Sequence, residues 1–151
     1  MRTVEAEAEV VLPPERAADL WRDSRRWSAF VEGFQRFVEV SPDWPETGSR
    51  LVWESVPRGR GRVTEKVVDT GDRRFATRVA EERLMGIQRA TFRPGEEGGS
   101  VVRLELDYEL TSEAPLKIVT DVIFIRRAVR DALRRTLQRF AIEAEDELGV
   151  R

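Results

Sequence analysis

The chain begins with apolar and polar side chains in alternation. Between Val4 and Leu12 the apolar residues recur at every second position, with glutamates between the first of them. A period of two predicts a β-strand with one buried face. The same period returns over residues 102–110. Between these two strands, stretches rich in Val, Phe, Trp and Thr are separated by turn sequences with Gly, Pro and Asp, and they predict further antiparallel strands.

Two short helices are expected directly after the first strand. A pair of prolines ends that strand, and proline fits the first turn of a helix, so we expect a helix over about residues 14–23. Ser24 can cap a second short helix that ends before Gly33. This corner forms either a small satellite core or a wall facing a ligand. Its aromatic residues are Trp21, Trp27, Phe30 and Phe34.

The last part of the chain has the period of a helix. Around Pro115 the pattern changes, and apolar residues then recur every three or four positions as far as Ala144. A helix of about thirty residues must bury its apolar stripe, and the partner large enough is the concave face of a bent sheet. The sequence therefore predicts an α+β helix-grip fold in one domain, residues 1–151. A strongly bent antiparallel sheet of six or seven strands would surround the C-terminal helix.

Composition excludes several classes of function. Hydrophobic residues make up 40% of the 151 residues and the net charge is −2, which favours a globular domain and argues against a dedicated nucleic-acid binder. The chain contains no cysteine and no histidine, so it has no disulfide, no thiol nucleophile, no Ser-His-Asp triad and no zinc site built on these residues. We expect no metal and no cofactor. The polar N-terminus and the lack of a long apolar run favour a cytoplasmic location. We expect the protein to be a monomer or a homodimer.

Two polar residues are expected among apolar ones on inner strand faces. Glu65 lies between Val63 and Val67, and Tyr108 lies in the alternation of the last strand. Burial raises the pKa of a carboxyl group, which is how a general acid or base is made. In the alternative interpretation, Glu65 lies near the end of its strand with its carboxylate in water.

Two registers are compatible with the strand near residues 84–94. We expect Gln88, Ala90 and Phe92 to face inward. In the other register, Arg89 faces the pocket and can hold a carboxylate or enolate of a ligand, alone or with Glu65.

The last helix carries two unusual surfaces. Arginines crowd its middle, as a solvated face or as a patch that attracts an anionic membrane or an acidic partner. Residues 118–119 and 122–125 are apolar on nearly all sides of the helix. Burial against the two short helices is one explanation. The others are a dimer contact, a ligand gate or a tip that touches a membrane transiently.

The segment from Pro14 to Phe30 carries a family resemblance. It follows the first strand directly and contains Glu15, the pair Leu20-Trp21, Asp23 and Trp27. With the order of elements, it resembles the START-like (SRPBCC) superfamily, in particular its polyketide cyclase/dehydrase branch. The resemblance implies a deep cavity between sheet and helix for a hydrophobic small molecule such as a lipid, a quinone or an aromatic polyketide. No catalytic residue of the aromatase/cyclase enzymes can be matched to this chain.

Three functions are therefore considered. The first is binding or carrying a hydrophobic small molecule. The second is a metal-independent cyclase, dehydratase or aromatase with Glu65, Tyr108 and Arg89 as candidate catalytic residues. The third is a structural or chaperone-like protein whose cavity is too small for a ligand. The expected pocket lining is Trp27, Phe30, Trp53, Phe75, Tyr108, Val129, Leu133 and Phe140.

Overall fold

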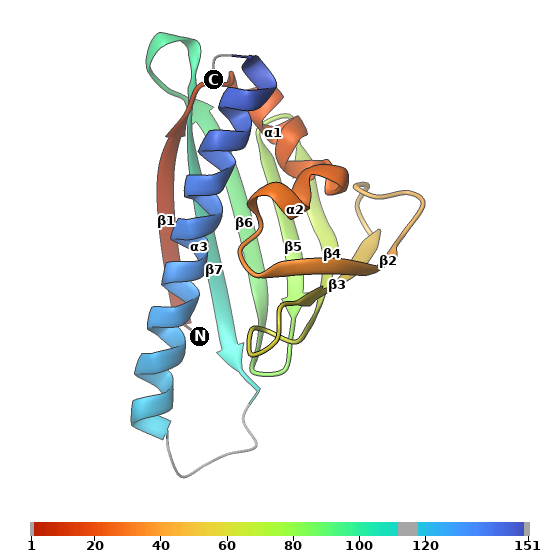
Figure 1. Cartoon of the computed structure of the whole chain (residues 1–151), viewed down its shortest axis with the longest axis vertical. Coiled ribbons are helices and arrows are strands. Elements are labelled where there is room, and N and C mark those ends of the chain that lie inside the picture. Colours follow the sequence, from red (N-terminus) through yellow and green to blue (C-terminus); the bar gives the residue numbers. More distant parts are fainter. Residues whose placement is uncertain (1, 112–117, 150–151) are drawn as a thin grey trace.

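A computed structural model describes residues 2–111 and 118–149 of the chain (Figure 1). One antiparallel sheet has the strand order β1-β7-β6-β5-β4-β3-β2. The strands are β1 (Arg2–Val10), β2 (Phe34–Val40), β3 (Arg50–Ser55), β4 (Arg62–Gly71), β5 (Arg74–Ala80), β6 (Leu84–Pro94) and β7 (Ser100–Leu110). The helices are α1 (Pro14–Arg22), η1 (Ser24–Arg26), α2 (Trp27–Phe30), η2 (Glu96–Gly98) and α3 (Ile118–Leu148). The predicted α+β helix-grip fold is confirmed.

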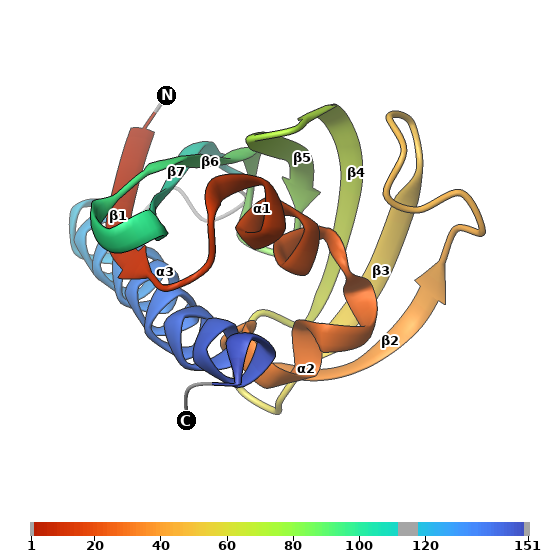
Figure 2. The same cartoon turned by 90° about the horizontal axis from the view of Figure 1, so that it is seen from above.

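The sheet curves around the helices. Figure 2 shows it as an arc from β1 to β2, with α1, α2 and α3 all on its concave side. Irregularities in pairing within β2 and β4 contribute to this curvature, because a β-bulge bends its strand and increases the local twist. Along β7, Leu104, Leu106 and Tyr108 are buried while the charged residues between them are partly exposed, as the period of two predicts.

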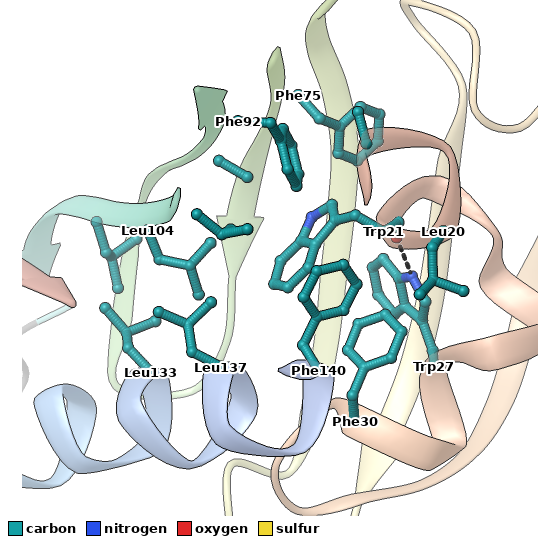
Figure 3. Packing of buried hydrophobic residues seen from close by; sticks show 14 of the residues in the cluster. Leu20, Trp21, Trp27, Phe30, Phe75, Phe92, Leu104, Leu133, Leu137 and Phe140 are labelled. Atoms are coloured by element: carbon teal, nitrogen blue, oxygen red, sulfur yellow. Dashed lines mark hydrogen bonds between the residues drawn. The ribbon is translucent and has the colours of Figure 1, made fainter. Parts of the chain in front are cut away.

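The C-terminal half of α3 fills the centre of the fold. Leu137, Phe140 and Ala144 are almost completely buried. The Phe140 ring lies 5.2 Å from Trp21 of α1 and 5.1 Å from Phe30 of α2, measured between ring centroids (Figure 3). These edge-to-face contacts join the aromatic corner to the main core, so it is not a separate satellite core.

The turn between α1 and α2 differs in one detail from the expectation. Asp23, not Ser24, caps η1, because the Asp23 carboxylate accepts a hydrogen bond from the backbone N–H of Arg25 at 3.1 Å. The Trp27 indole N–H donates to the backbone carbonyl of Trp21 at 2.9 Å, which fixes α2 against α1 (Figure 3). Gly33 follows α2 with a φ of +76°, a conformation that favours glycine.

The beginning of α3 is far less covered than its end. Ile123 and Phe124 are 57% and 75% exposed. Of the explanations considered for this segment, burial against the short helices is wrong for Ile123 and Phe124, because α1 and α2 lie beside the C-terminal half of α3 (Figure 1). There Arg26 of η1 forms ion pairs with Glu143 and Glu147. The change of pattern at Pro115 and the side chains of residues 118–119 lie outside the described residues.

Candidate functional site

An apolar cavity lies under the exposed half of α3. Its volume is about 70 Å³. Its floor is formed by inner residues of β6 and β7, its roof by α3, and one end by the turns that join β3 to β4 and β5 to β6. The lining residues are Arg60, Glu81, Arg83, Leu84, Gln88, Leu106, Ile125, Ala128, Val129, Ala132 and Leu133.

Small side chains on α3 explain why a space remains there. Ala128 and Ala132 are four positions apart and therefore lie on one face of the helix, toward the cavity. Further along α3 the buried positions carry Leu137 and Phe140, which fill the corresponding space. The cavity thus lies along the part of α3 that carries these two alanines.

An ion pair between Arg60, whose side chain is 27% exposed, and the buried side chain of Glu81 forms the polar end of the cavity. The Glu81 side chain is only 3% exposed and accepts a hydrogen bond from Nε of Arg60. The Arg60 guanidinium also lies over Trp53, with Cζ 5.3 Å from the ring centroid. Arg83 and Gln88 line the cavity beside this pair. The cavity is therefore apolar over most of its wall and charged at one end.

Neither Arg60 nor Glu81 stands out in the sequence. Arg60 lies in a glycine-containing stretch that is typical of a hairpin turn, and Glu81 is one of two adjacent acids that make no convincing catalytic pair. Their proximity could have been inferred only from the predicted order of the strands. In an antiparallel meander alternate turns lie at the same end of the sheet, which brings the β3–β4 and β5–β6 turns together.

Glu65 on β4 points inward, as predicted, and is 5% exposed. Its two carboxylate oxygens accept hydrogen bonds at 2.9 Å each from the Trp53 indole N–H and the Thr77 hydroxyl. Burial raises the pKa of Glu65, although the hydrogen bonds from Trp53 and Thr77 and the charge of Arg60 oppose this shift. The alternative with its carboxylate in water is wrong. A chain of contacts connects Glu65 through Trp53 to Arg60 at the cavity.

We expect Glu65→Gln to flatten the pH dependence of stability above pH 4.5, the ordinary pKa of this group. A raised pKa means that the folded state binds the proton more tightly than the unfolded state. The wild type should therefore lose stability as the pH rises from 4.5 to the folded pKa of Glu65, by at most about 1.4 kcal/mol per pH unit. Urea unfolding of both proteins across this range measures the difference.

Glu54→Gln is the matched control for this measurement. The Glu54 side chain on β3 is 25% exposed, and its hydrogen bond from Arg62 lowers its pKa below 4.5. The stabilisation by ionised Glu54 is lost as the pH falls from 4.5 through the lowered pKa. Glu54→Gln should therefore change the pH dependence of the free energy of unfolding only below pH 4.5. If Glu65→Gln keeps the wild-type slope above this pH, the raised pKa of Glu65 is contradicted.

Arg89 is not a pocket residue. It lies on the outer face of β6, is 47% exposed and donates a hydrogen bond to Asp107 of β7 at 2.7 Å. Gln88 faces the cavity, and Ala90 and Phe92 on the same strand face are buried, which confirms the favoured register. The alternative with an inward Arg89 is wrong, because the pairing of β6 with β7 places Arg89 among outward acids.

The predicted lining residues fall into two groups. Val129 and Leu133 line the cavity. The others are buried in the core around it, and several fill the end near α1 and α2 (Figure 3). This second group consists of Trp27, Phe30, Trp53, Phe75, Tyr108 and Phe140.

The described residues contain neither a group of metal ligands nor a helix suited to span a membrane. Within residues 2–111 and 118–149, no three acidic side chains are grouped so that they could hold a metal ion. In the same part of the chain, no helix is both long and apolar enough to cross a membrane.

Comparisons with known proteins identify the family. The family described as "Polyketide cyclase / dehydrase and lipid transport" matches residues 1–145. A search of curated proteins gives no match.

Several solved structures share the fold. TTHA0849 from Thermus thermophilus superposes with a TM-score of 0.80 at 21% identity, over 97% of this chain and 99% of that one. A START superfamily protein from Mycobacterium smegmatis gives 0.70 at 14% identity, over 93% and 97% of the two chains. A norcoclaurine synthase point mutant from Thalictrum flavum, in complex with a transition state analogue, gives 0.68 at 14% identity, over 97% and 95%. Because the family match spans nearly the whole sequence, this chain belongs to the polyketide cyclase / dehydrase and lipid transport family of the START-like (SRPBCC) superfamily.

Proposed function

We propose that the protein binds or carries a hydrophobic small molecule, such as a lipid, a quinone or an aromatic polyketide, between the sheet and α3. The observation that carries this proposal is the apolar cavity under α3. Leucines from β6 and β7 face Ile125, Val129 and Leu133 of the helix there, and a single polar end adjoins them. Such a wall favours an apolar ligand, and its few polar groups orient it. Membership of a family whose description includes lipid transport supports the same conclusion.

The size of the cavity requires that it expand. Sites that bury drug-sized ligands typically have about 300–1,000 Å³, whereas this cavity has about 70 Å³. The N-terminal half of α3 is the element suited to move, because Ile123 and Phe124 are exposed and α1 and α2 hold the other half. A ligand would enter by displacing this half of the helix, in contact with Val129 and Leu133. We propose that the other predicted lining residues contact the ligand once the cavity has expanded.

Native mass spectrometry and a fluorescent probe test this function. We expect the purified protein to retain an apolar compound or, once stripped of it, to bind N-phenylnaphthylamine with a saturable rise in fluorescence. A protein that retains nothing and shows no saturable probe binding would support the structural or chaperone-like function instead.

A metal-independent cyclase, dehydratase or aromatase activity is the alternative function. It is favoured by the buried Glu65, whose contacts lead through Trp53 and Arg60 to the cavity. The similar fold of norcoclaurine synthase supports the view that this architecture can hold an enzyme site. Glu65 and Tyr108 stay the proposed proton-handling residues. Turnover, detected as a change in mass of the added compound, would distinguish an enzyme from a carrier.

The predicted partners other than the ligand stay predictions. Transient membrane contact is supported by the exposed Ile123 and Phe124, with Arg127 exposed on the same part of α3. Such a surface combines apolar insertion with attraction to anionic lipids. The cytoplasmic location and the choice between monomer and homodimer are likewise still predictions.

A further inference from the structure

We propose that the ligand of this cavity carries a carbonyl-type oxygen, in a ketone or a carboxylate, and that Tyr108 and Gln88 bind this oxygen. The inference rests on the proposed function and adds the chemical class of the ligand. Three observations carry it: a buried hydroxyl without a partner, its position in the sheet, and an excess of hydrogen-bond donors around the cavity.

The Tyr108 hydroxyl is buried and has no hydrogen-bond partner among the described residues. The side chain is 0% exposed. Buried polar groups are nearly always paired, since an unpaired one has lost its water without compensation. A phenylalanine at this position would fill the core without that cost. The hydroxyl is therefore explained best by a partner that is bound only part of the time.

The strand register places Tyr108 among residues that line the cavity. Leu106, the adjacent inner residue of β7, is part of the lining. Tyr108 pairs with Gly86 of β6, which has no side chain. The inner residues on either side of Gly86 are Leu84 and Gln88, and both line the cavity. Tyr108 therefore lies on the same inner face of the sheet as three lining residues and is next to them in the register. A modest enlargement of the cavity would reach its ring.

The polar groups at this wall are mostly donors. The Gln88 amide has no side-chain hydrogen bond within the described residues, and Arg83 forms no ion pair there. Glu81, the acid at the cavity, is already paired with Arg60. The Tyr108 hydroxyl and the Gln88 amide can each donate and accept, whereas Arg83 only donates and is positively charged. Together they match an acceptor oxygen, and the charge of Arg83 disfavours an ammonium group. Between a ketone and a carboxylate, the positive charge of Arg83 favours the carboxylate.

A matched series of ligands on one ring system tests this inference. Naphthalene, acetylnaphthalene and naphthoate share the apolar body and differ in the oxygen group. We expect the wild type to bind acetylnaphthalene about three- to tenfold more tightly than naphthalene, and naphthoate at least as tightly as the ketone. In Tyr108→Phe the preference for the ketone should fall by most of this factor, while naphthalene affinity and melting temperature should be no lower than in the wild type.

Ser100→Ala is the control for loss of a buried hydroxyl. Ser100 is similarly buried, but its hydroxyl donates to the backbone carbonyl of Leu12 at 2.6 Å. Its removal should lower the melting temperature and leave the ketone preference unchanged. Equal affinity of the wild type for all three compounds would overturn the inference and leave the proposed function intact. A wild type that binds none of them, nor N-phenylnaphthylamine, would overturn both.

If Tyr108→Phe lowers the melting temperature and retains the ketone preference, Tyr108 is a structural residue and the inference is wrong. Gln88→Leu provides the second arm, because it removes a donor from a partly exposed position at little risk to folding. We expect it to reduce ketone and carboxylate binding by a similar factor without weakening naphthalene binding.

Discussion

Ala132→Leu is expected to weaken the binding of N-phenylnaphthylamine without loss of stability. Ala132 lines a cavity of about 70 Å³, so the added carbon atoms occupy the space that the ligand needs. Filling an existing cavity typically stabilises a protein by about 0.5–2 kcal/mol, whereas overpacking a solid core destabilises by about 1–3 kcal/mol. Probe titration and thermal unfolding of the variant measure both effects. We expect the affinity for the probe to fall by at least about tenfold, which corresponds to about 1.4 kcal/mol.

The same substitution at Ala29 is the matched control. Ala29 is exposed on α2, away from the cavity, so Ala29→Leu should leave probe binding unchanged. If Ala132→Leu is clearly destabilised while the wild type binds no probe, the space under α3 is part of a packed core. The hypothesis of a ligand site would then be wrong.

Arg60→Met is expected to destabilise the protein by about 2 kcal/mol. This lies between the cost of about 0–1 kcal/mol for an exposed ion pair and about 3–5 kcal/mol for a buried one, because Glu81 is buried while the Arg60 side chain is 27% exposed. The substitution leaves the Glu81 carboxylate, 3% exposed, without its guanidinium partner. It also removes the stacking of Arg60 on Trp53, which contributes about 0.5–1 kcal/mol. Denaturant unfolding at neutral pH measures the loss.

Two further variants separate the causes of this loss. The double variant Arg60→Met/Glu81→Met no longer leaves a charge buried, so it should recover most of the stability. Arg74→Met breaks an exposed pair with Asp69, whose side chains are 59% and 51% exposed, and should change stability by about 0–1 kcal/mol. If the double variant is as unstable as Arg60→Met, packing on Trp53 rather than the buried charge holds this end of the cavity.

Glu65 and Arg89 show when the pattern of a strand predicts which side chains face inward and when it does not. Around Glu65 the neighbours separate into an apolar and a polar set, so its inward direction follows from the sequence alone. Around Arg89 both faces carry mixed residues, and two registers remain compatible with the sequence. The pairing of β6 with β7 resolves this, since it sets Arg89 opposite Glu105 and beside Asp107.

The position of the cavity could be found only from the tertiary structure. Ala128 and Ala132 are visibly small in the sequence, but a small residue can mark either a close contact or an open space, depending on what lies opposite. Likewise Arg60 and Glu81 are 21 residues apart and meet only because two turns lie at the same end of the sheet. The exposure of Ile123 and Phe124 depends on where α1 and α2 end against α3.

The sequence by itself determined the order of the elements, their buried faces and the inward carboxylate of Glu65. Periodicity carries this information, because a residue's neighbours along an element show which face is apolar. Only the tertiary structure decided which ions pair, where the space under α3 lies and how small it is. These properties depend on distances between elements that are far apart in the chain, and no local pattern records such distances.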